Sequence, residues 1–192
     1  MVVPILEAFS TYRKVYFPTG RWFVLDRLEE VGEPLHSREY QAYIPKNAIG
    51  LFLKGGSIVP MSEGANIQTT AEGRNQSLKL FVVPDLTGRA SGDLFWDDGE
   101  SELGLYRYSF FTFRSRIGRS GGSVKTLVQT RNFLTVPKVS RLIICGVGTR
   151  PRRVAVNNRT VPYFRTYYNA EFNVLNVYST LNLLRNNTLV WS

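Results

Sequence analysis

Short runs of β-branched and aromatic residues, bounded by glycine, proline, asparagine and aspartate, recur along the whole chain and constrain its fold most. Apolar residues nowhere keep a helical period over three turns, so long amphipathic helices are not expected. Such runs are typical of strands in stacked antiparallel sheets, and they predict an all-β fold. The candidate strands are Val2–Leu6, Arg13–Phe17, Arg21–Leu25, Tyr40–Ile44, Gly50–Leu53, Ile58–Pro60, Leu78–Val83, Gly92–Trp96, Tyr106–Arg116, Ser123–Gln129, Ser140–Gly146, Arg152–Asn157, Val174–Ser179 and Asn187–Ser192.

The polar stretch Ser62–Gly73 interrupts the strand pattern long enough to be a linker. It predicts two antiparallel β-sandwich domains in tandem, the first over residues 1–67 and the second over residues 68–192. The first domain is small for an independent core. Its apolar residues, such as Phe9, Tyr16 and Phe17, therefore indicate docking onto a larger body.

The formal net charge is +9, and 18 of the 24 basic residues are arginine. A nucleic-acid binder is one hypothesis for such a charge. The arginines are dispersed from Arg13 to Arg185, however, whereas nucleic-acid binders usually concentrate charge along one groove or helix. We therefore expect a solvated basic face and no nucleic-acid partner. No apolar run approaches the roughly 18 residues that cross a bilayer, so no membrane contact is expected either.

The segment Leu94–Ser101, with Trp96 followed by several acids, is the best candidate for chemistry. Glycoside hydrolysis by the usual route needs two carboxyl groups that face each other, about 5 Å apart for retention and more for inversion. Adjacent strand residues point to opposite faces, so Asp97 and Asp98 cannot readily form that pair. We expect instead that Trp96 packs inward and that Asp98–Gly99 makes a hairpin turn.

Metal sites are weaker hypotheses for the same segment. Asp93, Asp97, Asp98 and Glu100 could offer oxygen ligands to calcium, although their spacing does not match an EF-hand loop. Calcium stays an open alternative. Structural zinc needs several nitrogen and sulfur ligands, and the chain has one histidine and one cysteine. The prediction is that the chain holds no metal and no cofactor.

The remaining reactive side chains have ordinary structural interpretations. His36 beside Ser37 lies in a polar loop, and adjacency does not create a serine nucleophile with its base. Cys145 lies in an apolar run, which favours a small core residue. The segments Gly118–Gly122 and Gly146–Gly148 lack the features of phosphate loops and are predicted turns. No catalytic residue is predicted.

Exposed aromatic residues could stack on sugar rings, which would favour a carbohydrate-binding module. In an all-β chain, aromatic residues at alternating positions more often belong to the core. Only a surface-exposed coplanar pair would overturn that interpretation. The aromatic residues concerned are Trp22, Trp96, Trp191, Tyr106, Tyr108, Phe110, Phe111, Phe113, Tyr167 and Tyr168.

Three acceptor sequons for N-glycosylation occur, at Asn75, Asn158 and Asn186, each beside a predicted turn or strand end. Sequons arise by chance, so each is weak alone. Together they favour glycosylation at these three asparagines and a secretory-pathway protein that is luminal or extracellular.

Four motifs follow one another along the chain: Pro4–Glu7, Val15–Trp22, Leu51–Pro60 and Gly92–Ser101. Their order and spacing resemble the region that follows the catalytic barrel in the α-glucosidases of glycoside hydrolase family 31. The group of maltase-glucoamylase, sucrase-isomaltase and lysosomal α-glucosidase is the most similar. The resemblance is strong before Ser101 and weak from Glu102 to Ser140, and the later strands are similar as well. The similar segments in the later strands are Leu142–Gly148, Val154–Asn157 and Thr188–Ser192.

The resemblance implies a proximal and a distal β-sandwich packed on a (β/α)₈ barrel. The family's catalytic aspartates lie in barrel segments that have no counterpart here, so no catalytic role carries over to Asp26, Asp85 or the other aspartates. The expected function is therefore a non-catalytic C-terminal region that supports an α-glucosidase barrel and is inactive alone. A carbohydrate-binding module for α-glucan is the alternative.

Overall fold

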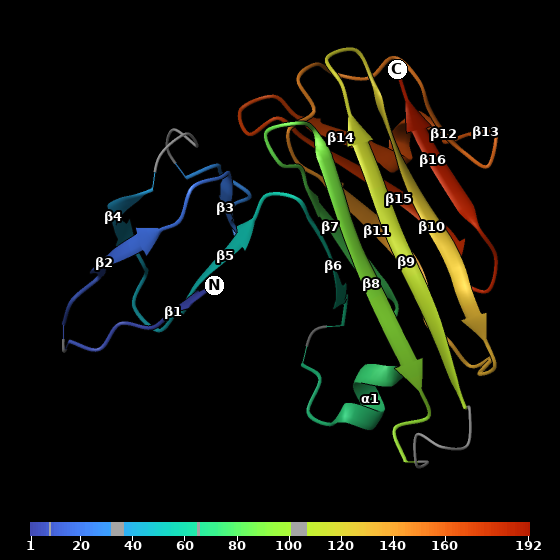
Figure 1. Cartoon of the computed structure of the whole chain (residues 1–192), viewed down its shortest axis with the longest axis horizontal. Coiled ribbons are helices and arrows are strands. Elements are labelled where there is room, and N and C mark those ends of the chain that lie inside the picture. Colours follow the sequence, from blue (N-terminus) through green and yellow to red (C-terminus); the bar gives the residue numbers. More distant parts are fainter. Residues whose placement is uncertain (8, 32–36, 65, 101–106) are drawn as a thin grey trace.

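A computed structural model of the chain describes residues 1–7, 9–31, 37–64, 66–100 and 107–192. The predicted all-β fold is confirmed, because the regular elements of these described residues are strands β1 to β16 with one short helix, α1, and one 3₁₀ turn, η2. No helix in the described ranges has the length and hydropathy to cross a membrane. Figure 1 shows two units side by side, a smaller one from the N-terminal strands and a larger one from the rest of the chain.

The smaller unit consists of two small sheets that share one core. Phe17 is buried in this core, so its expected role in docking is wrong. Its ring contacts Trp22 and Phe52 edge-on, with ring centroids 5.4 and 5.0 Å away. Val3 and Ala42 are buried in the same cluster, so every strand of the unit contributes to it. One sheet has the order β1-β5-β3 and the other pairs β2 with β4. The strands are β1 (Val2–Val3), β2 (Tyr12–Phe17), β3 (Trp22–Val24), β4 (Arg38–Tyr43) and β5 (Gly50–Lys54).

The larger unit is one continuous hydrogen-bonded sheet folded into two layers. Its strand order is β13-β12-β16-β10-β9-β8-β6-β7-β11-β15-β14. In Figure 1, β8, β9 and β10 form the near layer, and β7 and β11 lie behind them. The elements are β6 (Ser57–Ser62), α1 (Thr70–Arg74), β7 (Leu78–Val83), β8 (Arg89–Asp97), β9 (Tyr108–Ile117), β10 (Gly122–Arg131), β11 (Lys138–Ile144), β12 (Val154–Val156), β13 (Arg159–Thr160), η2 (Tyr163–Arg165), β14 (Thr166–Asn169), β15 (Val174–Asn182) and β16 (Asn187–Trp191).

The sheet bends from one layer into the other between β8 and β6. A single residue pair, Ser57 with Ser91, joins these two strands. Gly92 permits this approach, because a Cβ atom there would collide with the carbonyl oxygen of Ile58. Successive side chains of a strand point to opposite faces of the sheet, so every second side chain fills the space between the layers. In β9, for example, Phe111 and Phe113 are buried while Arg114 is exposed.

The outer face of the back layer is apolar and lies against the smaller unit. Phe81, Val83 and Ile143 form one buried cluster with Phe23 of β3. Cys145, just after β11, belongs to the same cluster and has no exposed surface. Strands β7 and β11 are therefore buried on both faces, and the two units share a core at their junction.

Hydrogen bonding assigns β6 to the larger sheet, where it pairs antiparallel with β7. This strand falls within the first predicted domain, residues 1–67, and the division of the chain at that point stays a prediction. Two neighbouring pairs, β7 with β11 and β6 with β8, are parallel rather than antiparallel. Residue alternation does not distinguish the two arrangements when both faces are buried.

Helix α1 lies inside the stretch predicted to be a linker. Thr69 caps it by accepting a hydrogen bond of 3.2 Å from the backbone N–H of Glu72, and the Glu72 carboxylate accepts one of 3.0 Å from Gln68. The first bond is that of a capping box, whereas the second reaches the residue before the N-cap rather than the N-cap itself. The helix buries no residue, so the hydrophobic pattern contained no sign of it.

The buried thiol of Cys145 predicts a pH dependence of stability. Burial raises the pKa of Cys145 from 9.0 to about 12, so the thiol stays neutral in the fold at pH values where the unfolded chain ionises it. The free energy of unfolding should then fall by about 1.4 kcal/mol per pH unit above pH 9 because of this group alone. Urea titrations at pH 8, 9 and 10 should show a steeper decline for the native chain than for Cys145→Ala. Equal slopes would contradict the assignment.

Candidate functional site

The acidic segment lies at the end of β8, beside helix α1. Trp96 is partly buried and packs against the main core of the larger unit. The guanidinium of Arg74, at the end of α1, lies 5.2 Å from the centre of the Trp96 ring. The prediction that Trp96 packs inward is therefore confirmed, and the residue that covers it comes from a helix that sequence reasoning missed.

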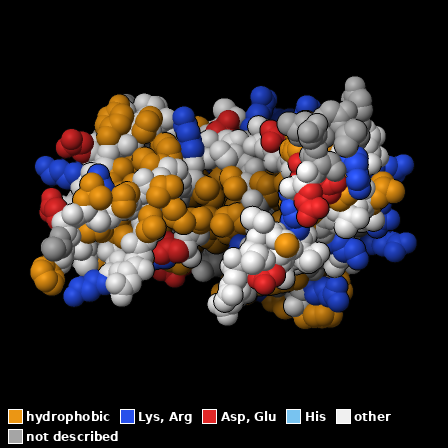
Figure 2. Space-filling view, turned by 90° about the horizontal axis from the view of Figure 1, so that it is seen from below, with side chains coloured by type: hydrophobic (Ala, Val, Ile, Leu, Met, Phe, Trp, Pro, Cys, Tyr) orange, Lys and Arg blue, Asp and Glu red, His pale blue; other side chains and the backbone are white. Residues whose placement is uncertain are grey.

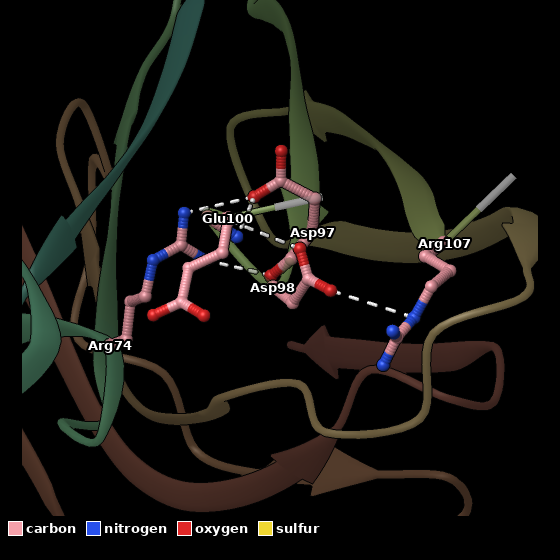
Figure 3. A network of polar contacts seen from close by, with 6 residues as sticks. Arg74, Asp97, Asp98, Glu100 and Arg107 are labelled. Atoms are coloured by element: carbon pink, nitrogen blue, oxygen red, sulfur yellow. Dashed lines mark hydrogen bonds and ion pairs between the residues drawn. The ribbon is translucent and has the colours of Figure 1, made fainter. Parts of the chain in front are cut away.

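Arg74 also binds the strand end directly. It donates hydrogen bonds of 2.7 Å to the carbonyl oxygen of Asp97 and 2.9 Å to the Asp97 carboxylate. The same carboxylate oxygen accepts a bond of 2.9 Å from the backbone N–H of Gly99. Asp97 is thus engaged both by a cation and by the turn that follows it (Figure 3).

Asp98 points toward a different arginine. Its carboxylate lies 3.5 Å from Nε of Arg107 and accepts a hydrogen bond of 3.2 Å from the backbone N–H of Glu100. Figure 3 shows Arg74 and Arg107 on opposite sides of Asp98. The two neighbouring aspartates therefore serve different ion pairs and stabilise the chain after β8.

Strands β8 and β9 form a hairpin, as expected, with Asp97 opposite Tyr108. The register corrects one detail. The predicted turn at Asp98–Gly99 does not close the hairpin, because the connection runs from Asp98 to Arg107. Part of this connection lies outside the described residues.

In the described ranges, no group of three or more histidine, cysteine or acidic side chains is arranged to hold a metal ion. Asp97 is engaged by Arg74, and Asp98 forms an ion pair with Arg107. Neither the calcium site nor a facing carboxylate pair finds support in this arrangement. His36 lies outside the described residues.

The other candidate positions agree with their structural interpretations. The Cys145 thiol is fully buried, and burial raises its pKa to about 12, which makes it a poor nucleophile at neutral pH. Gly118–Gly122 closes the hairpin between β9 and β10, with a backbone bond of 2.8 Å from Gly118 to Gly121. Gly146 adopts a φ of 72° directly after β11.

In the described part of the chain, no neighbouring pair of aromatic rings lies side by side in one plane. Trp22 and Trp191 are buried, as expected for core residues. Phe95 and Tyr108 are a surface pair, but their rings stack on each other at 5.0 Å with an interplanar angle of 24°. Each ring therefore covers one face of the other, whereas a platform needs rings side by side in one plane.

The three sequon asparagines are exposed and occupy bends in the chain. Asn75 ends helix α1, Asn158 lies in the tight turn between β12 and β13, and Asn186 precedes β16. The side-chain oxygen of Asn186 accepts a hydrogen bond of 2.8 Å from the backbone N–H of Val128. The positions are accessible for modification, which itself stays a prediction.

Comparison with known proteins identifies the family. Residues 1–59 match the Glycosyl hydrolase family 31 C-terminal domain. Lysosomal alpha-glucosidase of Bos taurus is 32% identical over 177 residues, which cover 85% of this chain and 19% of that protein. The chain belongs to glycoside hydrolase family 31, as its C-terminal β region.

Intestinal sucrase-isomaltase of Oryctolagus cuniculus is 28% identical over 95% of the chain and 10% of that protein. The solved structure of a glucosidase II alpha subunit matches 98% of the chain and 22% of its own length, with a TM-score of 0.81 and 15% identity. At that identity the structure shows the shared fold. This family 31 region thus spans about a fifth or less of these relatives.

The conformation of Gly99, just after β8, predicts how a substitution there changes stability. It adopts a φ of 78°, and a Cβ atom there would lie 2.6 Å from the Arg74 guanidinium. Gly99→Ala should lower the free energy of unfolding by about 1–3 kcal/mol and displace Arg74 from Trp96. Chemical denaturation measures the loss. Gly148→Ala is the matched control, since its Cβ would meet no atom closer than 4.0 Å, and an equal loss in both variants would contradict the argument.

Proposed function

We propose that this chain is a non-catalytic region that supports the (β/α)₈ barrel of an α-glucosidase. The observation that carries the proposal is an exposed apolar surface on the smaller unit, within the segment that matches the family domain. The parent activity would be hydrolysis of terminal α-linked glucose, as the name of the bovine relative suggests. The barrel would supply the catalytic aspartates.

The exposed surface is formed by β2, β4 and the loop before β2. Leu6 is 75% exposed and Phe9 is 96% exposed. On the outer face of the β2-β4 pair, Tyr12 and Tyr43 are also exposed, and their rings lie 5.2 Å apart. A pocket of about 440 Å³ between Leu6 and Tyr12 is lined by charged and polar side chains as well, those of Glu7, Arg13, Lys14 and Gln41. Figure 2 shows hydrophobic side chains gathered over the smaller unit.

Exposure of this kind is costly for a domain in water. Burying a large apolar side chain contributes about 1.5–3 kcal/mol, so Leu6, Phe9 and their neighbours would gain stability from a covering body. The smaller unit already contacts the larger one through Phe23. Its remaining apolar surface is available for the barrel.

A secretory location belongs to the same proposal. The relatives carry the names lysosomal alpha-glucosidase and intestinal sucrase-isomaltase. A luminal or extracellular position would expose Asn75, Asn158 and Asn186 to the glycosylation machinery.

A chimera tests the support role. This chain would replace the corresponding C-terminal region of bovine lysosomal alpha-glucosidase, and secreted activity on nitrophenyl α-glucoside would be measured. We expect an active chimera, while the double variant Leu6→Ser/Phe9→Ser should lower secreted activity several-fold through loss of apolar docking. The matched control is Leu86→Ser/Leu134→Ser, which changes two leucines of the larger unit that are 53% and 65% exposed.

Equal losses in the two double variants would contradict docking through the smaller unit. The isolated chain provides a second test, because it should not cleave the nitrophenyl substrate at all. Robust turnover by the purified chain would overturn the non-catalytic assignment.

Glycosylation is tested by expression in a secretory host. Removal of N-glycans by an endoglycosidase should lower the mass, and Asn75→Gln, Asn158→Gln and Asn186→Gln should each remove one glycan. Asn132→Gln, an exposed asparagine outside any sequon, is the control and should leave the mass shift intact. A secreted chain whose mass does not change on enzymatic treatment would refute the proposal.

A further inference from the structure

A second pocket lies where the two edges of the large sheet meet. Strands β13 and β14 are the end strands of that sheet, and residues 161–165 connect them across the open side of the sandwich. The pocket beside this connection has a volume of about 420 Å³. Its walls come from β12, β13, β15, the η2 connection and the loop before β16.

Three arginines from three separate segments line this arginine pocket. They are Arg159 of β13, Arg165 of η2 and Arg185 of the loop before β16. All three are exposed, and no aspartate or glutamate lines the pocket. Among the described residues, none of the three has a carboxylate within ion-pair distance.

Several other arginines of the chain are paired. Arg21 binds Glu30 with two hydrogen bonds of 2.7 Å, and Arg74 binds Asp97. A guanidinium is a rigid fork of donors that matches the oxygens of a phosphate or sulfate group. Three such groups around one concave site, with no acid to neutralise them, favour a ligand with an anionic oxygen group.

Tyr178 contributes an aromatic ring to the same pocket. The Arg141 guanidinium lies 5.0 Å from the ring centre, and Arg141 is itself held by hydrogen bonds of 2.7 and 3.2 Å to Asn176 and by Glu63 at 3.8 Å. The ring is therefore positioned before any ligand binds. It is 43% exposed, which leaves surface for a sugar ring.

The remaining walls suit a polyol. Thr160, Ser179 and Thr180 bring hydroxyl groups, which donate and accept hydrogen bonds, while Val161 and Pro162 add apolar contact. We propose that the arginine pocket binds a small saccharide that carries a phosphate or sulfate ester. The guanidinium groups take the ester, and Tyr178 with the hydroxyls takes the ring. This binding does not depend on the proposed support role.

The basic face of β8, β9 and β10 is a different kind of surface. Arg114 and Arg116 are exposed on the outer side of β9, opposite Lys125 and Ser123 of β10. They line none of the described pockets. These arginines therefore serve as controls for unspecific attraction between the cationic chain and any anion.

Calorimetry with the full chain at low salt tests the proposal. The probes are glucose 6-phosphate, glucose 6-sulfate, inorganic phosphate, adenosine 5′-monophosphate and glucose. We expect both sugar esters to bind, inorganic phosphate to bind about tenfold more weakly, and glucose to give no measurable heat. Stronger binding of adenosine 5′-monophosphate than of either sugar ester would overturn the saccharide assignment.

The pH dependence distinguishes the two esters. Arginine stays charged at all accessible pH values, whereas a phosphate monoester gains its second charge near a pKa of about 6. Binding of glucose 6-phosphate should therefore strengthen between pH 5 and pH 7, while binding of glucose 6-sulfate should stay constant. A flat profile for the phosphate ester would contradict direct contact between guanidinium and ester.

Substitutions locate the site. Arg159→Gln, Arg165→Gln and Arg185→Gln should each weaken both esters about tenfold, since each removes charge-assisted hydrogen bonds. Tyr178→Leu should weaken the esters and leave inorganic phosphate unchanged. The double variant Arg114→Gln/Arg116→Gln removes charge elsewhere and should change the affinities less than twofold. Equal weakening by this control and by the pocket variants would overturn the proposal, and so would pocket variants with native affinity.

Discussion

Burial of the back layer on both of its faces is the constraint on which the rest of the molecule depends. One face of β7 and β11 packs inside the sandwich, where Leu80, Leu142 and Ile144 have no exposed surface. The opposite face is also apolar, and it is covered by Phe23, which is 1% exposed. Each large apolar side chain on that face would lose about 1.5–3 kcal/mol if the units separated. The smaller unit is thus a cover for the sheet, with its own remaining apolar surface turned elsewhere.

The strand pattern was sufficient to predict the fold class, because alternation is visible wherever one face is polar. In β9 the alternation of Phe111 and Phe113 with Arg114 and Arg116 marks both the strand and its buried face. The same reasoning fails where both faces are buried. The apolar run Leu142–Cys145 indicated a strand and contained no information on its parallel partner, β7, or on the unit that covers it.

Short elements were missed for a related reason. Helix α1 buries no side chain and β13 is two exposed residues long, so neither carries a hydrophobic period. The sequence did contain the cap of α1, Thr69 with Glu72, but the polar composition around it favoured a linker. Missing α1 meant missing Arg74, which decides what the acids after Trp96 do. The acidic segment could be recognised from the sequence alone. Its partner Arg74 could not, because Arg74 lies far from the segment in the sequence.

The surplus of basic residues lies in the second part of the chain. This distribution matters for how a pocket there can select its ligand. Residues 1–67 hold seven basic and seven acidic residues, while residues 68–192 hold 17 and eight. On the outer face of the larger unit, Arg89 lies opposite Arg116 and Arg114 lies opposite Lys125. Like charges in such positions are destabilising by a few tenths of a kcal/mol to about 1 kcal/mol.

Asp85 lies beside this row of cations: the backbone N–H of Arg89 donates a hydrogen bond to its carboxylate and is the main cause that holds the pKa of Asp85 below its ordinary value, with a smaller contribution from the charge of Arg89. The remaining field attracts anions of every kind to the larger unit and is screened by salt, so it raises encounter rates without choosing among ligands. Discrimination requires donors fixed around a concave site of limited size. In the larger unit, Arg159, Arg165 and Arg185 line one such concave site together with Tyr178, and we infer that a bound ester would fix their guanidinium groups there. The surplus of basic charge and the arginine pocket therefore have different physical roles, the first in attraction and the second in recognition.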